Sequence, residues 1–478
     1  MRIRGPFLGA VFLVASCAGQ PDSYPALAPV PPPNWTSADV SNQAPEDDWL
    51  DVFGDPRIAE LVREALDANP NLRAQAFTVA ATQAQARATY GRSLPNVSVS
   101  GSAGLTSTPV EIGGDLNRVD SETFGIDASL SWEADLWGRV GAQIDAARAD
   151  LVASQEDFRA ARLSLTGQTV IAWFDLSEAI AQERVASETV SARERALELT
   201  ERRFSRGLST ALDVRTARSS LASAEASVAA REQASGNAIR RLEILLGRYP
   251  SGLIEGATPL PELPTIAPGG APADLLIRRP DVAASEARLV AAGFRAEQAR
   301  LSLFPSLSIT ARASSTENAL GDALDPARLA AQLISNLSAP VFTGGALRAE
   351  REAAQARAES AAENYVSTVL TAWSEVEDTL AADGFLALQE TAQLRALEEA
   401  RLAEELGERQ YANGLISIFN LIDLQTRRLN AESSVISARS ARASNRVRYH
   451  LALGGGAPEL RTSMSPNLET DTDRIIVQ

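Results

Sequence analysis

Two hydrophobic periods alternate along the chain. Between about residues 55 and 93, apolar side chains such as Ile58, Leu61 and Val62 recur at helical spacing. From Asn96 the period changes to two, because apolar or small residues from Val97 onward alternate with serine and glycine. Helical spacing then returns from about 140 to 206 and again from about 210 to 246. This pattern predicts helix, two strands, one very long helix and a shorter helix.

The second half of the chain repeats this order. A predicted helix–turn–helix reads RRFSRGLSTALDVRTAR from Arg202 and RQYANGLISIFNLIDLQ from Arg409, and Gly207 and Gly414 match at an offset of 207 positions. Each glycine is placed to end one helix in a left-handed conformation. The chain therefore predicts two structural repeats, with four strands at about 96–105, 124–132, 307–314 and 329–339.

The predicted division of the chain into segments follows from these repeats and from the composition of the stretches between them. It comprises a signal peptide at 1–16, a lipidated proline-rich arm at 17–54, a first repeat at 55–247, a linker at 248–272, a second repeat at 273–454 and a polar tail at 455–478. If Trp173 and Trp373 correspond, the long helix of the second repeat gains seven residues. A gain of seven would keep a coiled-coil seam in phase.

The N-terminus has the pattern of an export signal. Arg2 and Arg4 precede the apolar segment Phe7–Ala15, which is too short to span a bilayer as a helix. Cys17 follows at once, and Val14-Ala15-Ser16-Cys17 resembles a bacterial lipobox. This predicts lipidation of Cys17, including palmitate, and a place in the cell envelope; the alternative is a stray cysteine within an ordinary signal peptide.

Composition argues against several classes of protein. The net charge of −16 disfavours nucleic-acid binding, which needs clustered positive charge. With one cysteine there is no intramolecular disulfide or cysteine metal cluster, and the lone His450 is more typical of a packing residue than of a ligand. Ser-His-Asp, HExxH and Walker patterns are not found. We therefore expect no enzyme activity, no cofactor and no metal site.

The strand number points to an assembly. Four strands cannot close a membrane-spanning barrel, and open strand edges are not tolerated in lipid. Three chains would supply twelve strands and twelve helical staves. The predicted fold is mainly α with a transmembrane β part: a trimeric twelve-stranded outer-membrane β-barrel continued by a twelve-helix periplasmic α-barrel.

Several segments carry a family resemblance: Trp49–Val62, Arg278–Leu289, Leu303–Ile309 and the two predicted turns. The chain resembles the TolC-like outer-membrane efflux proteins, within the lipoprotein branch that serves resistance-nodulation-division pumps. The resemblance implies a homotrimer in outer-membrane lipid that acts as a passive duct for drugs and other toxic small molecules. It also implies a periplasmic adaptor protein and an inner-membrane pump as partners, and hence a role in multidrug resistance.

The same resemblance assigns candidate functional residues. The turns Arg206-Gly207-Leu208 and Asn413-Gly414-Leu415 are expected to dock adaptor hairpins, the alternative being that they only cap helices. Phe419, Asn420 and Asp423 are expected to form the pore constriction, where Asn420 replaces a second aspartate of some relatives. The implied opening is an outward swing of the last helix with its neighbour.

Two other functions remain open at this point. One is the outer-membrane duct of a type I protein secretion system. The other is a structural coiled-coil envelope lipoprotein, which would explain the long helices and Cys17 but not two pairs of alternating strands.

Overall fold

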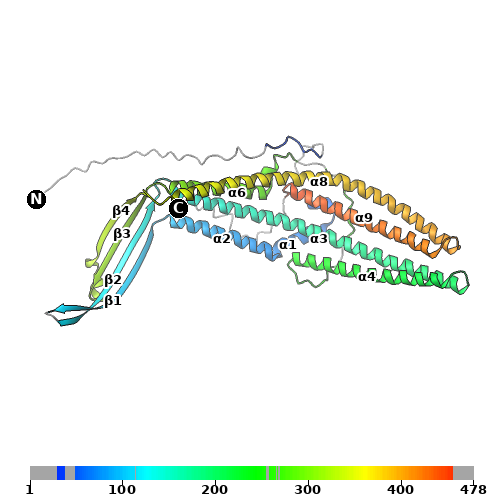
Figure 1. Cartoon of the computed structure of the whole chain (residues 1–478), viewed down its shortest axis with the longest axis horizontal. Helices are drawn as coiled ribbons and strands as arrows, with labels where there is room; N and C mark the ends of the chain where they lie inside the picture. Colours follow the sequence, from blue (N-terminus) through cyan, green and yellow to red (C-terminus); the bar gives the residue numbers. More distant parts are fainter. Residues whose placement is uncertain are drawn as a thin grey trace. The chain divides into compact units, whose positions relative to one another are not determined.

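The computed structural model describes residues 30–37, 49–112, 115–254, 258–264, 266 and 270–455 (Figure 1). These residues form two compact units. Unit 1 contains the described residues of 81–153 and 285–365, and unit 2 contains those of 29–80, 154–284 and 366–455. Both repeats therefore contribute to both units. Among the residues described, none of the helices combines the length and apolar character needed to cross a membrane.

Unit 1 is built on an antiparallel sheet in the order β1-β2-β3-β4 (Figure 1). The strands are β1 (Asn96–Ile112), β2 (Asp115–Ala134), β3 (Ser306–Glu317) and β4 (Ala330–Ser338). β1 and β2 are longer than predicted, because the segment expected to be a loop pairs from Thr106↔Ser121 to Ile112↔Asp115. Pro109 lacks an N–H group but is tolerated, since β1 is an edge strand. The short helices α7 (Leu320–Ala323) and η3 (Pro326–Arg328), which connect β3 and β4, were not predicted.

The sheet has one apolar and one polar face. Cross-strand neighbours on one face are Val97, Leu130, Ala311 and Leu333. The next row, on the opposite face, is Ser98, Ser129, Arg312 and Gln332. On the apolar face Val97 and Leu333 are 67% and 73% exposed in the single chain. A two-faced sheet of this kind is typical of a barrel with lipid outside and water inside.

Long helices dominate unit 2. Four helices lie entirely within this unit: α1 (Pro56–Ala68), α4 (Ala211–Leu245), α5 (Leu275–Arg278) and α9 (Ile418–Ala452). Four other helices have residues in both units: α2 (Pro70–Arg92), α3 (Arg139–Ser205), α6 (Pro280–Leu301) and α8 (Ala346–Ala412). α3 and α8 each contain 67 residues, which corresponds to a length of about 100 Å.

The two repeats have equal helix lengths, so the predicted insertion of seven residues is wrong. α3 and α8 have 67 residues each, and α4 and α9 have 35 each. The bounding glycines Gly138, Gly207 and Gly247 have positive φ, as do Gly345, Gly414 and Gly454, each exactly one 207-residue offset later. Trp173 therefore corresponds to Leu380 and not to Trp373. The two tryptophans serve different contacts, because Trp173 donates to Asp55 Oδ2 and Trp373 donates to the Pro272 carbonyl oxygen.

The described part of the N-terminal arm is bound to unit 2. Trp35 is buried among Leu275, Val376 and other apolar residues, and its indole N–H donates to the Gly270 carbonyl oxygen at 3.1 Å. The backbone N–H groups of Thr36 and Ser37 donate to the Glu377 carboxylate at 2.6 and 2.9 Å. The arm is thereby attached both to α8 and to the linker between the repeats.

Candidate functional site at the two helical turns

Two glycine turns end the long helices. Gly207 has a φ of 71° and Gly414 a φ of 77°, a conformation that L-residues with a side chain rarely adopt. In each turn two backbone hydrogen bonds close the end of the helix. Leu208 N donates to Arg203 O and Leu415 N donates to Gln410 O, both at 2.9 Å. Gly207 N donates to Phe204 O at 2.9 Å, and Gly414 N donates to Tyr411 O at 3.0 Å. The sequence-based prediction of glycine caps describes this geometry.

The structure brings the two turns together. Thr200 Oγ1 of α3 lies 2.6 Å from the phenol oxygen of Tyr411 in α8. Arg203 donates to the Tyr411 carbonyl oxygen at 2.7 Å, and its guanidinium lies 5.2 Å from the centre of the Tyr411 ring. Ala196, Ala217 and Leu421 belong to the apolar cluster packed around this tyrosine. The two turns therefore form one end of unit 2, as Figure 1 shows.

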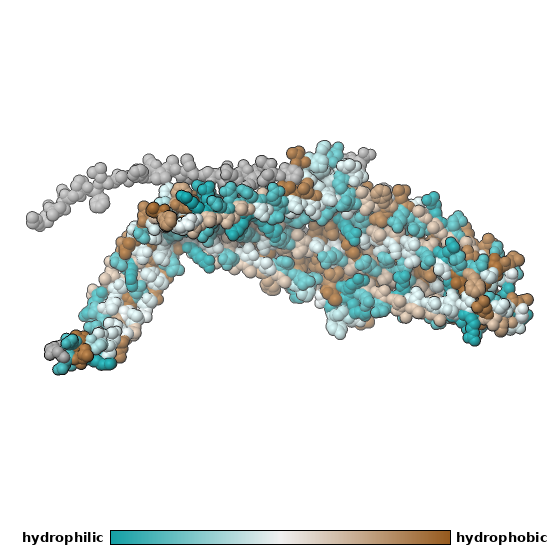
Figure 2. All heavy atoms as spheres, in the orientation of Figure 1, coloured by the Kyte–Doolittle hydropathy of each residue, from teal (hydrophilic) through white to brown (hydrophobic). Residues whose placement is uncertain are grey.

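The outer surface of this end is partly apolar. Leu208 and Leu415 are 64% and 73% exposed, and Arg206 and Asn413 are exposed beside them. Figure 2 shows hydrophobic patches among polar ones at this end of unit 2. The end that holds both turns thus exposes leucines beside polar side chains.

The helices after the turns begin with different caps. Thr210 and Asp213 form a reciprocal capping box, in which Asp213 Oδ2 accepts from Thr210 N at 2.8 Å. This backbone hydrogen bond is the main reason why the pKa of Asp213 lies below its usual value. In the second repeat Ser417 Oγ accepts from Asn420 N at 3.3 Å and donates to Asn420 Oδ1 at 2.7 Å. Asn420 is thus both a predicted pore residue and part of a helix cap.

The other two predicted pore residues are exposed on α9. Phe419 is 50% exposed, and Asp423 lies one helical turn further along. Asp423 Oδ2 accepts from Arg427 Nε at 2.8 Å, and both side chains of this ion pair are more than half exposed. Arg427 was not part of the sequence-based site, although its i+4 spacing from Asp423 is a signal that could have found it.

The buried Arg193 and the partly buried Arg428, both close to the turns, were also missed. Arg193 of α3 donates to Gln425 Oε1 at 2.6 Å and to Thr426 Oγ1 at 2.8 Å, and it also binds the Ile422 carbonyl oxygen. Arg428 of α9 forms ion pairs of 2.5 Å with Glu404 of α8 and with Glu432. The start of α9 is therefore attached to both α3 and α8. An arginine within the buried seam of a helix was the available sequence signal, because such a charge needs partners.

The predicted lipidation site lies outside the described residues. Cys17 belongs to the segment 1–29, and its lipidation stays a prediction from sequence. The remaining predicted residues all lie in unit 2, within the two turns or in the first two turns of α9.

Known proteins of one family match nearly the whole chain. The family model described as outer membrane efflux protein matches residues 61–248 and 271–455. The chain is 30% identical over 463 residues to the pyoverdine export outer membrane protein OpmQ of Pseudomonas aeruginosa, covering 94% of this chain and 96% of the relative. It is 26% identical to the probable outer membrane lipoprotein SilC of Salmonella typhimurium, covering 94% and 98%. The solved outer-membrane channel OprN superposes with a TM-score of 0.82 at 27% identity, covering 89% of this chain and 97% of that chain.

Proposed function

Because the chain belongs to the outer membrane efflux protein family, we propose that three copies form the passive outer-membrane duct of a tripartite efflux system. The chain is an outer-membrane efflux protein with the fold of the TolC-like channels. The observation that supports the trimer is the sheet of unit 1, in which β1 and β4 are the outer strands and each pairs on one side only among the described residues. Three such sheets would pair edge to edge into a twelve-stranded barrel with its apolar face toward lipid.

The helical unit supports the second half of the duct. α3 and α8 run as single long helices, and α4 and α9 run beside them to the shared end with both turns. Each copy would supply four columns of helix to the wall, so that three copies make a twelve-helix tube in the periplasm. Lipidation at Cys17 would add a membrane anchor to each copy.

The partners belong to the same proposal. A periplasmic adaptor docks its hairpins on the turns Arg206-Gly207-Leu208 and Asn413-Gly414-Leu415, where two exposed leucines offer apolar contact. An inner-membrane pump of the resistance-nodulation-division type supplies the energy. The cargo is small toxic molecules, in line with the names of relatives such as the toluene efflux protein TtgC of Pseudomonas putida. A purely helical envelope lipoprotein does not account for the four-stranded sheet, and no observation favours a protein-secretion duct.

The constriction of the duct lies at the start of α9. In a trimer, Phe419 would contribute an apolar ring and Asp423 a ring of three carboxylates, which favours cations. Opening by an outward swing of α8 and α9 would have to break the hydrogen bonds from Arg193 to Gln425 and Thr426. The duct thus has a closed state stabilised by contacts between α3 and α9.

Planar-bilayer recording tests this function. The purified protein should give a cation-preferring conductance, and Asp423→Ala should weaken the preference. Glu225→Ala, which removes an exposed carboxylate from α4, serves as the matched control and should leave the preference unchanged. A protein that gives no conductance even after Arg193→Ala has removed the contacts to Gln425 and Thr426 contradicts the duct, whereas an unchanged preference in Asp423→Ala removes only the pore role of Asp423.

A further inference from the structure

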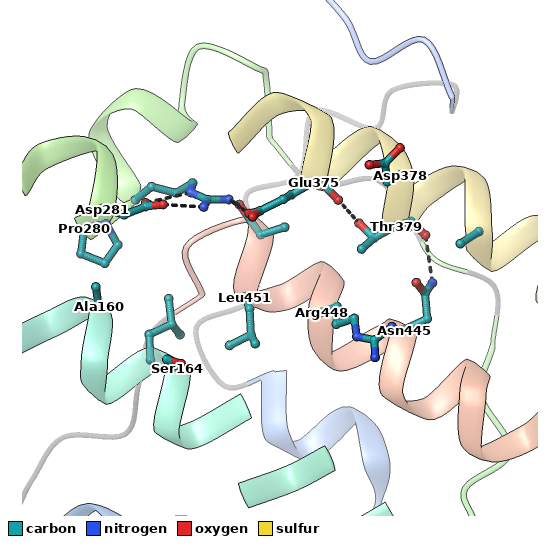
Figure 3. A pocket seen from close by; sticks show the side chains of 14 residues that line it. Ala160, Ser164, Pro280, Asp281, Glu375, Asp378, Thr379, Asn445, Arg448 and Leu451 are labelled. Atoms are coloured by element: carbon teal, nitrogen blue, oxygen red, sulfur yellow. Dashed lines mark hydrogen bonds and ion pairs between the residues drawn. The ribbon is translucent and has the colours of Figure 1, made fainter. Parts of the chain in front are cut away.

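A cavity of about 630 Å³ lies within unit 2, where residues of α3, α6, α8 and α9 come together (Figure 3). Its volume is within the range of about 300–1,000 Å³ that is usual for small-molecule sites. One part of the lining is apolar and consists of Ala160, Leu163, Pro280, Ala382, Leu451 and Ala452. The cavity therefore offers an apolar surface on which the body of a small molecule can pack.

A buried arginine in the lining is paired through each of its nitrogen atoms. Arg279 is 7% exposed, and its Nε and Nη2 atoms donate to the Asp281 carboxylate at 2.9 and 2.6 Å. Its Nη1 atom donates to Glu375 Oε2 at 2.6 Å and to the Ala452 carbonyl oxygen at 3.1 Å. Asp281 neutralises the charge of Arg279, so Glu375 adds a negative charge to the cavity.

Two side-chain oxygen atoms of the lining have no hydrogen-bond partner among the described residues. Asn445 is 5% exposed, and its Nδ2 atom donates to the Thr379 carbonyl oxygen at 2.9 Å (Figure 3). This bond fixes the orientation of the amide, because a carbonyl oxygen can only accept, and it leaves Asn445 Oδ1 unpaired. Glu375 Oε1 is also unpaired, since only Oε2 binds Arg279. A ligand that donates hydrogen bonds would satisfy both oxygens.

The remaining charges of the lining favour a cation. Asp378 of α8 is exposed and accepts one hydrogen bond of 3.2 Å from a serine hydroxyl. Arg448 of α9 is exposed and makes no hydrogen bond within the described part of the chain. Apart from the Arg279–Asp281 pair, the lining thus holds the two carboxylates Glu375 and Asp378 against one guanidinium, an excess of one negative charge.

The first repeat lacks these acceptors. Neutral side chains stand 207 positions earlier: Gln168 for Glu375, Ile171 for Asp378 and Ala238 for Asn445. All three line a smaller groove of about 370 Å³ between α3 and α4. Equivalent helix pairs therefore form with and without the acceptors, so helix packing alone does not account for them.

We propose that this cavity binds a small organic cation in which a protonated amine is attached to an apolar body. The N–H groups would donate to the free oxygens of Asn445 and Glu375, and the apolar body would pack on Leu163 and Leu451. Hydrogen bonds from an ammonium group to a carboxylate are charge-assisted and hence stronger than neutral ones. The site lies within one chain, so it depends neither on the trimer nor on conduction through the duct.

Titration with dansylcadaverine tests the site. This probe joins a primary ammonium group to an apolar ring system whose fluorescence rises when it leaves water. The full-length protein, purified in an amphipathic polymer, should give a saturable rise. Dansylamide carries the same ring system without the ammonium group and should bind about tenfold more weakly, because it lacks the charge-assisted hydrogen bonds. The absence of a saturable rise, or equal affinity for the two probes, overturns the proposal.

Two exposed residues of the lining should change the affinity in opposite directions. Asp378→Asn removes an attractive charge and should weaken dansylcadaverine binding, whereas Arg448→Gln removes a repulsive charge and should strengthen it. Damage to the structure would weaken binding in both variants. Glu398→Gln and Arg395→Gln, which change exposed residues of α8 outside the cavity, are the matched controls. Changes of the same direction in the two cavity variants, or equal changes in the controls, contradict the site.

Filling the cavity gives a second readout. Ala382 is half-buried in the lining, so Ala382→Leu should occupy part of the space and reduce probe binding. Circular dichroism checks that this variant keeps its helices. A folded Ala382→Leu variant that binds the probe like the wild type would place the probe elsewhere and overturn the assignment. Bilayer conductance is measured independently, so failure of the cavity proposal leaves the proposed duct intact.

Discussion

Arg203 of the first turn donates a hydrogen bond of 2.7 Å to the carbonyl oxygen of Tyr411, which precedes the second turn. The two residues are 208 positions apart, and the guanidinium also stacks on the Tyr411 ring. One side chain thereby connects the two helical hairpins at the end where adaptor docking is proposed.

Replacing Arg203 with alanine should loosen the connection between the hairpins. A hydrogen bond from a charged donor contributes about 1.5–3 kcal/mol, so the loss should increase local opening near Tyr411. Hydrogen–deuterium exchange read by mass spectrometry should show faster exchange around residues 408–420. Arg206→Ala, in the same turn but exposed, is the control; equally fast exchange in that variant would mean that the Arg203 contact is unimportant.

The two turn glycines should respond differently to alanine. In both variants an alanine must adopt the left-handed conformation, which lowers the free energy of unfolding by about 1–2 kcal/mol. At Gly414 the added Cβ would also lie 3.0 Å from an Nη atom of Arg203, whereas at Gly207 it meets nothing within 4 Å. Thermal unfolding followed by circular dichroism should therefore show a larger loss for Gly414→Ala. Equal losses would indicate that Arg203 simply moves aside.

Removing Arg427 should strengthen the charge effect of Asp423. The pair is exposed, so its contribution to folding stability is small. Its loss nevertheless leaves the Asp423 carboxylate without the neighbouring positive charge. The reversal potential across a salt gradient should shift toward stronger cation preference in Arg427→Ala. Arg409→Ala, which breaks another exposed i,i+4 pair at the end of α8, is the control and should cause no shift.

His450 should make stability depend on pH. Burial, followed by the charge of Arg446, lowers its pKa from 6.5 to about 4. The unfolded chain therefore binds the proton more readily, and stability should fall as the pH drops from about 6.5 toward 4, by roughly 3 kcal/mol at most. The ring stacks on Trp49 at 5.3 Å, and its Nε2 atom is buried without a hydrogen-bond partner among the described residues.

The variant His450→Phe keeps a ring for stacking and removes the titration. Its unfolding midpoint should change less than that of the wild type between pH 7 and pH 5, a range above the ordinary pKa of most carboxylates. Identical pH profiles of the two proteins would assign the dependence to other groups.

The local features of the turns were predictable because each depends on neighbours in sequence. A glycine in the left-handed region and a Ser or Thr cap need only the next few residues. The Asp423–Arg427 pair is equally local, yet it was missed because the pore residues were assigned through a family resemblance. The alignment of Trp173 with Trp373 failed for the opposite reason: it relied on residue identity, whereas their partners Asp55 and Pro272 lie far away in the chain.

By itself the sequence determined the repeat, the order of the long helices and of the strands, and the glycine turns at which the long helices end, because these follow from periodicity and short-range backbone preferences. Tertiary structure decided how far β1 and β2 extend and which side chains join the hairpins. The contacts of Arg203 with Tyr411 and of Arg193 with Gln425 each join residues more than 200 positions apart. Such contacts depend on the packing of whole helices, and no local pattern specifies which helices meet.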